Sequence, residues 1–463
     1  MTENRGDTSC PQRDSAEREG YAEVPRTFRT LWKERGDAAP DLLERMLDRN
    51  NLNRAYKRVK ANKGAPGIDG MTVDEALPYL RENRDAIIGN VLRGKYTPCP
   101  VKRVEIPKPD GGVRLLGIPT VKDRILQQAF TQKLVPIYEP LFADGSYGCR
   151  PGRSCQDAIR KVAEYANEGY TQAVVLDLSK YFDTLNHNLP LNLLRRQIDD
   201  ERVIQIIKRW LKSGVMTNGV VMETGEGSPQ GGVISPLLAN IYLNEFDQEY
   251  TRRGVRFVRY ADDIVLFAKS RRAAQRLLEG AVRFLTQTLK LKVNEEKSRI
   301  TSVYSLRFQY LGFTLGAARN GAQIRIHPKK KQKIKRELKQ LTKRSKGLSV
   351  RVIMQLVEQK MRGWLQYYSL ACMKGFIADL AEWLRHRYRM IIWKQWKRIK
   401  TKMRNLRKLG IDKEKARQAA NTSHGPFWAT SHSTVNFAIT NKRLEAAGCY
   451  DIEAAYNQMH SSY

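Results

Sequence analysis

The sequence is poor in three features: long apolar runs, paired cysteines and, within its most basic segments, acidic residues. No apolar run approaches the roughly 18 residues that a membrane-spanning helix needs. No apolar core of a secretory signal follows the N-terminal methionine. These absences argue against membrane contact and export, and they predict a protein of the cytoplasm.

The cysteines and histidines are too scattered to indicate a metal centre or a disulfide framework. There are six of each, and no two cysteines form a CxxC pair. We therefore expect no zinc module and no metal-dependent nuclease cluster, and free thiols fit a reducing compartment. The six cysteines are Cys10, Cys99, Cys149, Cys155, Cys372 and Cys449.

Positive charge is the dominant feature of the composition. The 463 residues include 82 Lys and Arg against 48 Asp and Glu, a formal net charge of +34. Such an excess predicts a polyanionic partner, most simply nucleic acid. The excess is clustered: Arg385–Lys408 holds eleven basic residues and no acid. Because no acids balance this run, we interpret it as a nucleic-acid-binding face rather than a plain solvated face.

Two adjacent carboxylates lie between β-prone apolar residues in the segment Phe257–Phe267. The pattern predicts a tight hairpin with Asp262 and Asp263 at its tip. Crowded like charges are costly unless a cation lies between them, and Mg²⁺ prefers carboxylate oxygens and substrate phosphates. Taken alone, an Asp-Asp pair is more often a solvated turn than a metal site. Other residues of the chain are therefore needed to distinguish the two.

A third carboxylate, Asp177, lies at the end of a short apolar run that begins at Ala173. An unpaired charge at the end of a buried strand needs compensation. If this strand lies beside the hairpin, Asp177 joins Asp262 and Asp263, and the three can hold two cations about 4 Å apart for phosphoryl transfer. Asp183 is the rival ligand, and we interpret it as a structural or helix-start residue.

Two further segments are typical of loops that meet a ligand. Gly227–Asn240 combines paired glycines, which allow close backbone approach, with Gln230, which can hydrogen-bond sugar or base edges. Glu105–Pro119 predicts a hairpin whose Gly-Gly turn is flanked by Lys108 and Arg114. The alternatives are an ordinary strand-to-helix connection and a solvated basic hairpin.

These segments, taken with Asp177 and the string Tyr260–Asp263, resemble reverse transcriptases. From about residue 41 onward the chain resembles group II intron-encoded reverse transcriptase/maturases. The resemblance implies that Asp177, Asp262 and Asp263 are catalytic and hold two Mg²⁺ ions, and that the substrates are dNTPs.

The same resemblance implies nucleotide-binding roles for five further residues. They are Lys108 and Arg114 at the triphosphate, Gln230 on the nucleotide or template side, Phe182 against a ribose 2′-hydroxyl, and Lys297 near the leaving pyrophosphate. A core phenylalanine and a surface lysine are the alternatives for the last two, although a lysine there could act as a general acid.

The implied fold is α+β: a right-hand polymerase with fingers and a split-βαβ palm that has helices on one side of its sheet. An α-helical thumb and a small helical DNA-binding appendix follow. The compact bacterial class of the family lacks an HNH endonuclease, and we expect this chain to match it. The expected divisions are a disordered tail (1–40), fingers with an N-terminal extension (41–172), palm (173–315), thumb or maturase domain (316–408) and DNA-binding domain (409–463).

The thumb region interleaves aromatic residues with bases, a pattern that suits stacking and phosphate contacts. The alternative is that its tryptophans form a helix-bundle core and its bases are merely solvated. The predicted nucleic-acid-binding residues are Lys329, Lys330, Lys331, Lys335, Arg336, Arg385, Arg387, Lys394, Lys397 and Arg398.

The predicted function is an RNA-directed DNA polymerase that also binds its intron RNA as a splicing maturase and supports intron mobility in the bacterial cytoplasm. Its partners would be group II intron RNA, an RNA template, and a DNA primer or target. The sequence leaves the oligomeric state open, a monomer included. One alternative is a protein that serves mainly as a splicing cofactor, and another is a reverse transcriptase of another lineage, such as a retron or repair-associated enzyme. A third is an RNA-templated RNA polymerase, which Phe182 would disfavour if it excludes the ribose 2′-hydroxyl.

Overall fold

The computed structural model describes residues 41–107, 112–178, 187–217, 220–222, 231–343 and 347–461. These residues form two compact units, one ending at Val303 and one starting at Tyr304. Several predictions fall outside the described residues, namely those on the tail 1–40 and on Lys108, Phe182, Asp183 and Gln230.

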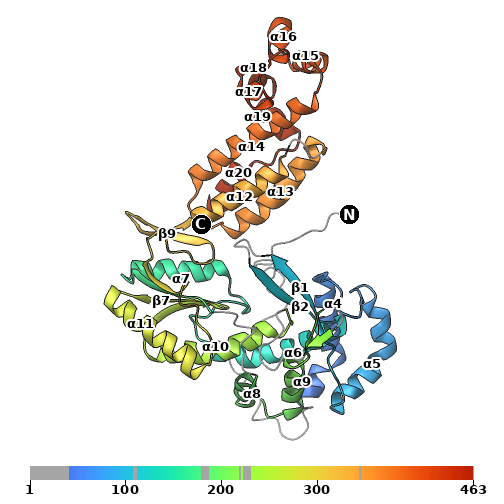
Figure 1. Cartoon of the computed structure of the whole chain (residues 1–463), viewed down its shortest axis with the longest axis vertical. Helices are drawn as coiled ribbons and strands as arrows, with labels where there is room; N and C mark the ends of the chain where they lie inside the picture. Colours follow the sequence, from blue (N-terminus) through green and yellow to red (C-terminus); the bar gives the residue numbers. More distant parts are fainter. Residues whose placement is uncertain are drawn as a thin grey trace. The chain divides into compact units, whose positions relative to one another are not determined.

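The first unit contains two four-stranded sheets surrounded by helices (Figure 1). Its helices are α3 (Leu42–Met46), α4 (Arg49–Ala61), α5 (Ala76–Leu92), α6 (Val121–Tyr138), η2 (Glu139–Leu141), α7 (Cys155–Asn167), α8 (Asn188–Arg195), α9 (Glu201–Leu211), α10 (Ser235–Arg252), α11 (Arg271–Arg283) and the π-helical turn η4 (Phe284–Thr288). Many begin at a Ser, Thr or Asp whose side chain accepts a backbone N–H, as Thr120 does for α6 and Ser154 for α7. These caps satisfy donors that a helix start leaves unpaired.

The fingers sheet contains the basic hairpin that the sequence predicts. Strands β1 (Val101–Pro107) and β2 (Val113–Ile118) pair antiparallel from Lys102–Ile118 to Pro107–Val113. Strand β4 (Val215–Thr217) adds to β1 in parallel, and β5 (Val220–Met222) completes the order β2-β1-β4-β5. Helices α3, α6, α8, α9 and α10 contribute to one apolar core, in which the Phe130 and Trp210 rings meet edge to face at 4.8 Å.

The palm sheet consists of β3 (Gln172–Leu176), β6 (Arg256–Tyr260), β7 (Asp263–Ala268) and β8 (Arg299–Ser302) in the order β6-β7-β3-β8. All neighbours are antiparallel. Helix α10 precedes the β6–β7 hairpin and α11 follows it, which gives the split-βαβ arrangement that the sequence predicts. Both helices pack on one face of the sheet in a core that includes Tyr242, Phe246 and Leu266.

The second face of the palm sheet is also covered, which differs from the expectation of helices on one side. Helix α7 lies beside the palm sheet (Figure 1) and packs against β6. The centre of the Tyr165 ring lies 5.6 Å from that of Phe267 on β7. Five consecutive residues of β7, Ile264 to Ala268, are buried. A strand covered on both faces has a continuous apolar run rather than an alternating one, as the sequence of β7 does.

The second unit is largely helical and starts with a hairpin. Strands β9 (Phe313–Ala318) and β10 (Gly321–Ile326) pair antiparallel around a two-residue turn. The helices are α12 (Pro328–Leu341), α13 (Val350–Tyr367), α14 (Lys374–Gln395), α15 (Ile399–Lys408), α16 (Lys413–Ala420), α17 (Pro426–Ser431), α18 (Ser433–Ala438), α19 (Asn441–Ala446) and α20 (Ile452–Ser461). Strand β9 crosses the predicted palm–thumb boundary at residue 315, so this hairpin continues strand structure beyond it. No helix among the described residues is both long and apolar enough to span a bilayer.

Candidate active site

The tip of the β6–β7 hairpin is a two-residue turn. Tyr260 pairs with Asp263, which leaves Ala261 and Asp262 as its central residues. Ala261 has a φ of 55°, and Asp262 is not among the positive-φ residues, a combination typical of a type II′ turn, where glycine is preferred at the first position. An alanine in this left-handed conformation costs about 1 kcal/mol. Such a strained position must be held by its surroundings.

The register of the palm sheet brings Asp177 to the same edge as this turn. Leu176 of β3 pairs with Ile264 of β7, so the next residue, Asp177, lies level with Asp263. Asp177 and Asp262 are half-buried, and Asp263 is exposed. Adjacent antiparallel strands are about 5 Å apart, so the three predicted catalytic residues emerge from neighbouring positions.

The end of β3 is fixed by hydrogen bonds between its backbone and the loop before β8. The Asp177 N–H donates to Ser298 Oγ at 3.1 Å, and the Asn294 N–H donates to the Asp177 carbonyl at 2.8 Å. Lys297 is exposed in this same loop, one residue from Ser298, and its N–H donates to Asn294 Oδ1 at 3.3 Å. The predicted pyrophosphate-side lysine therefore belongs to the loop that anchors Asp177.

The donor set at this edge fits a hard divalent cation. Asp177, Asp262 and Asp263 offer only carboxylate oxygens, the ligands that Mg²⁺ prefers. Across the described ranges, no three His, Cys, Asp or Glu side chains are gathered closely enough to form a finished ion site. The fit thus rests on backbone register and ligand chemistry, and the carboxylates would have to close around an ion.

The exit of the predicted Gln230 loop lies against the strand that carries Arg114. A Cβ on Gly231, whose φ is 118°, would overlap the Gly117 carbonyl oxygen of β2. Two residues further on, the Val233 N–H donates to Gln127 Oε1 of α6 at 2.8 Å, which fixes the backbone at this point. The contact explains the glycine at position 231, and it brings two predicted nucleotide-binding segments together within the first unit.

Most predicted nucleic-acid-binding residues of the second unit are exposed. On α12, Lys330 and Lys331 are half-buried, and Lys331 Nζ lies 5.1 Å from the centre of the Phe376 ring. Burial, followed by repulsion from Arg325, lowers the pKa of Lys331. The exposed members are Lys329, Lys335, Arg336, Lys394, Lys397 and Arg398.

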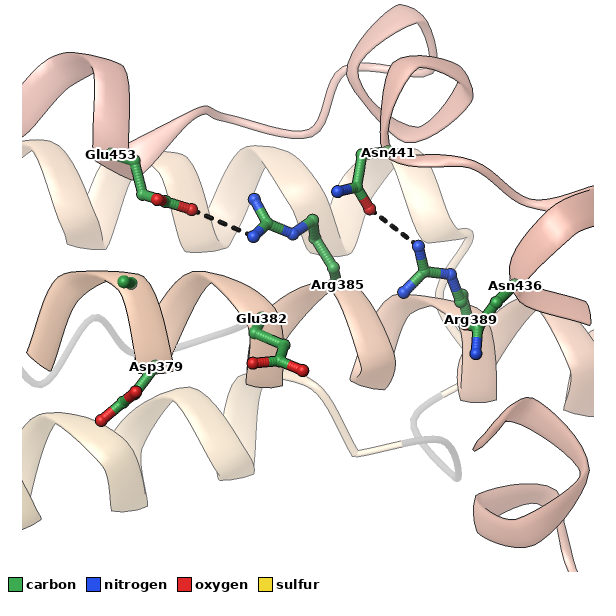
Figure 2. A pocket seen from close by; sticks show the side chains of 8 residues that line it. Asp379, Glu382, Arg385, Arg389, Asn436, Asn441 and Glu453 are labelled. Atoms are coloured by element: carbon green, nitrogen blue, oxygen red, sulfur yellow. Dashed lines mark hydrogen bonds and ion pairs between the residues drawn. The ribbon is translucent and has the colours of Figure 1, made fainter. Parts of the chain in front are cut away.

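Two predicted residues, Arg385 and Arg387, also hold the second unit together. Arg385 Nη2 donates to Glu453 Oε1 of α20 at 3.0 Å, beside a polar cavity of about 440 Å³ on α14 (Figure 2). Arg389, one turn further along, donates to Asn441 Oδ1 at 2.8 Å. Arg387 donates to the Thr342 hydroxyl at 2.5 Å. These contacts are structural, and the nucleic-acid roles of Arg385 and Arg387 stay predictions.

The sequence reasoning missed the buried polar residues beneath the hairpin tip. Arg259, the last residue but one of β6, is fully buried against Asp247 of α10. One local signal points to it: Arg259 shares a strand face with Phe257 because side chains alternate, so this face carries a charge where an apolar side chain is expected. Its partner Asp247 has no such signal, because the pairing depends on how α10 packs on the sheet.

Comparison with known proteins gives two family matches. Residues 106–315 match the family described as "Reverse transcriptase (RNA-dependent DNA polymerase)". Residues 331–410 match "Group II intron, maturase-specific domain". The two matches lie in the order that the sequence analysis expects for the palm and the thumb.

Two curated proteins carry the likeness, and one solved structure aligns more weakly. Protein YkfC of Escherichia coli (strain K12) is 36% identical over 304 residues, covering 57% of this chain and 80% of that protein. Group II intron-encoded protein LtrA of Lactococcus lactis subsp. cremoris is 31% identical over 343 residues, covering 60% of this chain and 57% of that protein. Among solved structures, a "Partial Cas6-RT-Cas1--Cas2 complex" aligns at 21% identity with a TM-score of 0.34, covering 54% of this chain and 43% of that chain.

Proposed function

Because the chain belongs to the family of group II intron-encoded reverse transcriptases and maturases, we propose that its RNA-directed DNA polymerase centre is the edge formed by Asp177, Asp262 and Asp263. The single observation that carries this proposal is the register of β3 against β7, which puts Asp177 level with Asp263. At this edge a primer 3′-hydroxyl would attack the α-phosphate of an incoming dNTP.

The reverse transcriptase family implies nucleotidyl transfer with a divalent metal. When bound, a pair of such ions stabilises the attacking and leaving oxygens of an in-line displacement. This chain would contribute carboxylate oxygens from two adjacent strands. Asp177 and Asp262 are the main proposed ligands, and Asp263, which points from the next position of the turn, assists.

The remaining groups bind and orient the nucleotide. Arg114 on β2 would clamp the triphosphate, since guanidinium pairs with phosphate oxygens in a fixed fork, and Lys108 would add a point charge beside it. Gln230 would contact the nucleotide or template, and Phe182 would exclude a ribose 2′-hydroxyl. Lys297, in the loop that anchors Asp177, would donate a proton toward the leaving pyrophosphate.

A second function, binding of group II intron RNA during splicing, is favoured by the second unit. Residues 331–410 match the maturase-specific domain, and exposed bases such as Lys394, Lys397 and Arg398 lie within them. Exposed bases bind phosphates without needing the palm carboxylates. The two functions are therefore compatible and separable by mutation.

The test of the proposed centre is Asp262→Asn, which removes a charge and keeps the shape of the side chain. We expect dNTP incorporation on an RNA template with a DNA primer to be abolished, because a neutral amide is a poor Mg²⁺ ligand. Thermal unfolding and affinity for group II intron RNA should stay at the wild-type level. The matched control is Asp74→Asn, an exposed carboxylate of the same unit. Normal primer extension by Asp262→Asn would refute the assignment.

A further inference from the structure

A charged pair is completely buried beneath the catalytic turn. The Arg259 and Asp247 side chains are both 0% exposed. The Arg259 Nε lies 2.9 Å from each Asp247 carboxylate oxygen, and Nη2 lies 2.5 Å from Oδ2. Complete burial raises the pKa of the Asp247 carboxyl, and the facing guanidinium opposes that shift. Either charge alone at this depth would be strongly destabilising.

The rest of the Arg259 guanidinium binds the turn and its neighbours. Nη1 donates to the carbonyl oxygen of Ala261 at 3.1 Å and to Asn240 Oδ1 at 2.9 Å. Nη2 also donates to Ser146 Oγ at 2.7 Å. Every N–H group of the side chain is therefore engaged, and one of them reaches the backbone of the residue that precedes Asp262.

A second contact holds the same residue from the 145–150 loop. A Cβ on Gly148 would overlap the Ala261 backbone nitrogen, so only glycine allows this approach. The Gly148 carbonyl in turn accepts from Asn240 Nδ2 at 2.8 Å, and the loop pairs with β6 through the Tyr147 N–H and the Arg259 carbonyl at 2.8 Å. Asn240 therefore links the two contacts, because it binds both Arg259 and Gly148.

We propose that Arg259 is a positioning residue for polymerisation: its hydrogen bond to the Ala261 carbonyl fixes the left-handed turn conformation that directs Asp262 and Asp263 toward Asp177. This inference rests on the proposed function. Ala261 has the φ of 55° that an alanine adopts only under constraint, and Arg259 and Gly148 supply that constraint from two directions. Asp247 orients the guanidinium, so it acts one step further from the metal-binding carboxylates.

An arginine is required here by its geometry. A lysine could keep an ion pair with Asp247, but its single nitrogen cannot also reach the acceptors that the planar fork of the guanidinium serves. If the buried pair served only the stability of the fold, a pair of apolar side chains of similar size could replace it, and the main cost would be the Arg259 hydrogen bonds to Asn240, Ser146 and Ala261. A role in positioning the turn predicts that such a replacement folds but polymerises poorly.

The experiment compares Arg259→Lys and the double variant Arg259→Leu/Asp247→Leu with wild-type protein. Each is assayed for kcat of dNTP incorporation across a Mg²⁺ titration, for intron RNA affinity and for thermal unfolding. We expect kcat to fall by about 10- to 100-fold, the scale for a displacement near 1 Å, and half-saturation to shift to higher Mg²⁺. Affinity for RNA should be unchanged in both variants.

The matched control is Arg256→Lys, on the same strand, where the side chain is exposed and its Nε lies 3.7 Å from Glu168 Oε2. It should retain wild-type kcat and Mg²⁺ dependence. Wild-type kcat and Mg²⁺ dependence in either Arg259 variant overturns the inference. It is also overturned if activity falls only in proportion to the loss of folded protein, since that indicates a structural role alone.

Failure of this inference is distinguishable from failure of the proposed centre. If Asp262→Asn polymerises normally, the proposed centre is wrong. If Asp262→Asn is inactive while the Arg259 variants keep the wild-type Mg²⁺ profile, the centre stands and only the positioning role is lost.

Discussion

The turn that carries Asp262 and the basic helices of the second unit depend on opposite kinds of contact. At the turn, each contact is made between particular atoms, as in the hydrogen bond from Arg259 Nη1 to the Ala261 carbonyl. In the segment Arg385–Lys408, eleven bases carry the same charge, and most are exposed. Metal-assisted chemistry depends on positions within fractions of an ångström, whereas polyanion binding adds many exchangeable charges. Single substitutions should therefore be severe at the turn and mild in the basic helices.

The most severe single change that this comparison predicts, outside the carboxylates and Arg259, is Gly148→Ala. The added methyl group would overlap the backbone nitrogen of Ala261 and displace the turn. We expect kcat for primer extension to fall by about 100-fold, because misplacement near 1 Å has effects of that size. Steady-state kinetics with a fixed RNA template and primer measures the loss.

The same substitution in the second unit should have the opposite sign, which sharpens the contrast. Gly363 lies inside α13, and a Cβ there would meet nothing within 4 Å. Gly363→Ala should raise the stability of the helix by about 0.5–1 kcal/mol, measured by denaturant unfolding, with primer extension unchanged. Equal losses of activity from both variants would contradict the contrast.

A moderate effect is expected from reversing three exposed charges together, Lys394, Lys397 and Arg398 to Glu. If each contacts one phosphate, intron RNA affinity should fall and the slope of log affinity against log salt should decrease by about 2 to 3. One reversal alone should produce roughly a third of this change. Filter binding across a salt series measures both quantities.

Three exposed arginines at the start of α11 provide the control for that result. Reversal of Arg271, Arg272 and Arg276 changes the net charge by the same amount in the first unit. We expect little change in the salt slope for intron RNA, since the proposed RNA face lies in the second unit. An equal decrease would mean that the total charge of the protein, rather than a particular face, governs binding.

The smallest effect is expected at the cap of α16. Asp412 accepts the backbone N–H groups of Glu414 and Lys415, which lowers the pKa of its carboxyl. A lowered pKa means that the cap stabilises the folded state above the ordinary Asp range and loses that contribution as the pH falls through the folded value. Asp412→Ala should decrease amide protection in α16 slightly at pH 7 and remove its decline in acid, as measured by hydrogen exchange.

The sequence was most informative where local pattern and pairing coincide. The apolar runs around Asp262 and after Ala173 predicted strands, and the register of β3 against β7 shows that these strands are neighbours, which the sequence alone left as a condition. The Gly-Gly turn predicted the β1–β2 hairpin for a similar reason. Periodicity and turn chemistry act within a few residues, so they can be read directly from a string.

Features that depend on distant parts of the chain could not be read in this way. Three such features join elements whose relative positions the sequence does not reveal. They are the packing of Tyr165 on the second face of the palm sheet, the ion pair of Arg259 with Asp247, and the ion pair of Arg385 with Glu453. The β9–β10 hairpin was missed for a different reason, since its short strands contain several alanines and glycines and lack a strong β signal.

The buried pair under the turn also bears on how the palm is assembled during synthesis. Asp247 and Ser146 emerge from the ribosome before Arg259, so α10 carries a carboxylate that cannot be buried until β6 arrives with its counter-ion. Helix α10, the 145–150 loop and the hairpin must therefore consolidate together, in one cooperative event. A nascent or truncated chain that ends before residue 259 would have no closed palm and would lack the hairpin tip that we propose as the metal-binding edge. The proposed polymerase centre would then form only once the core of the palm is complete.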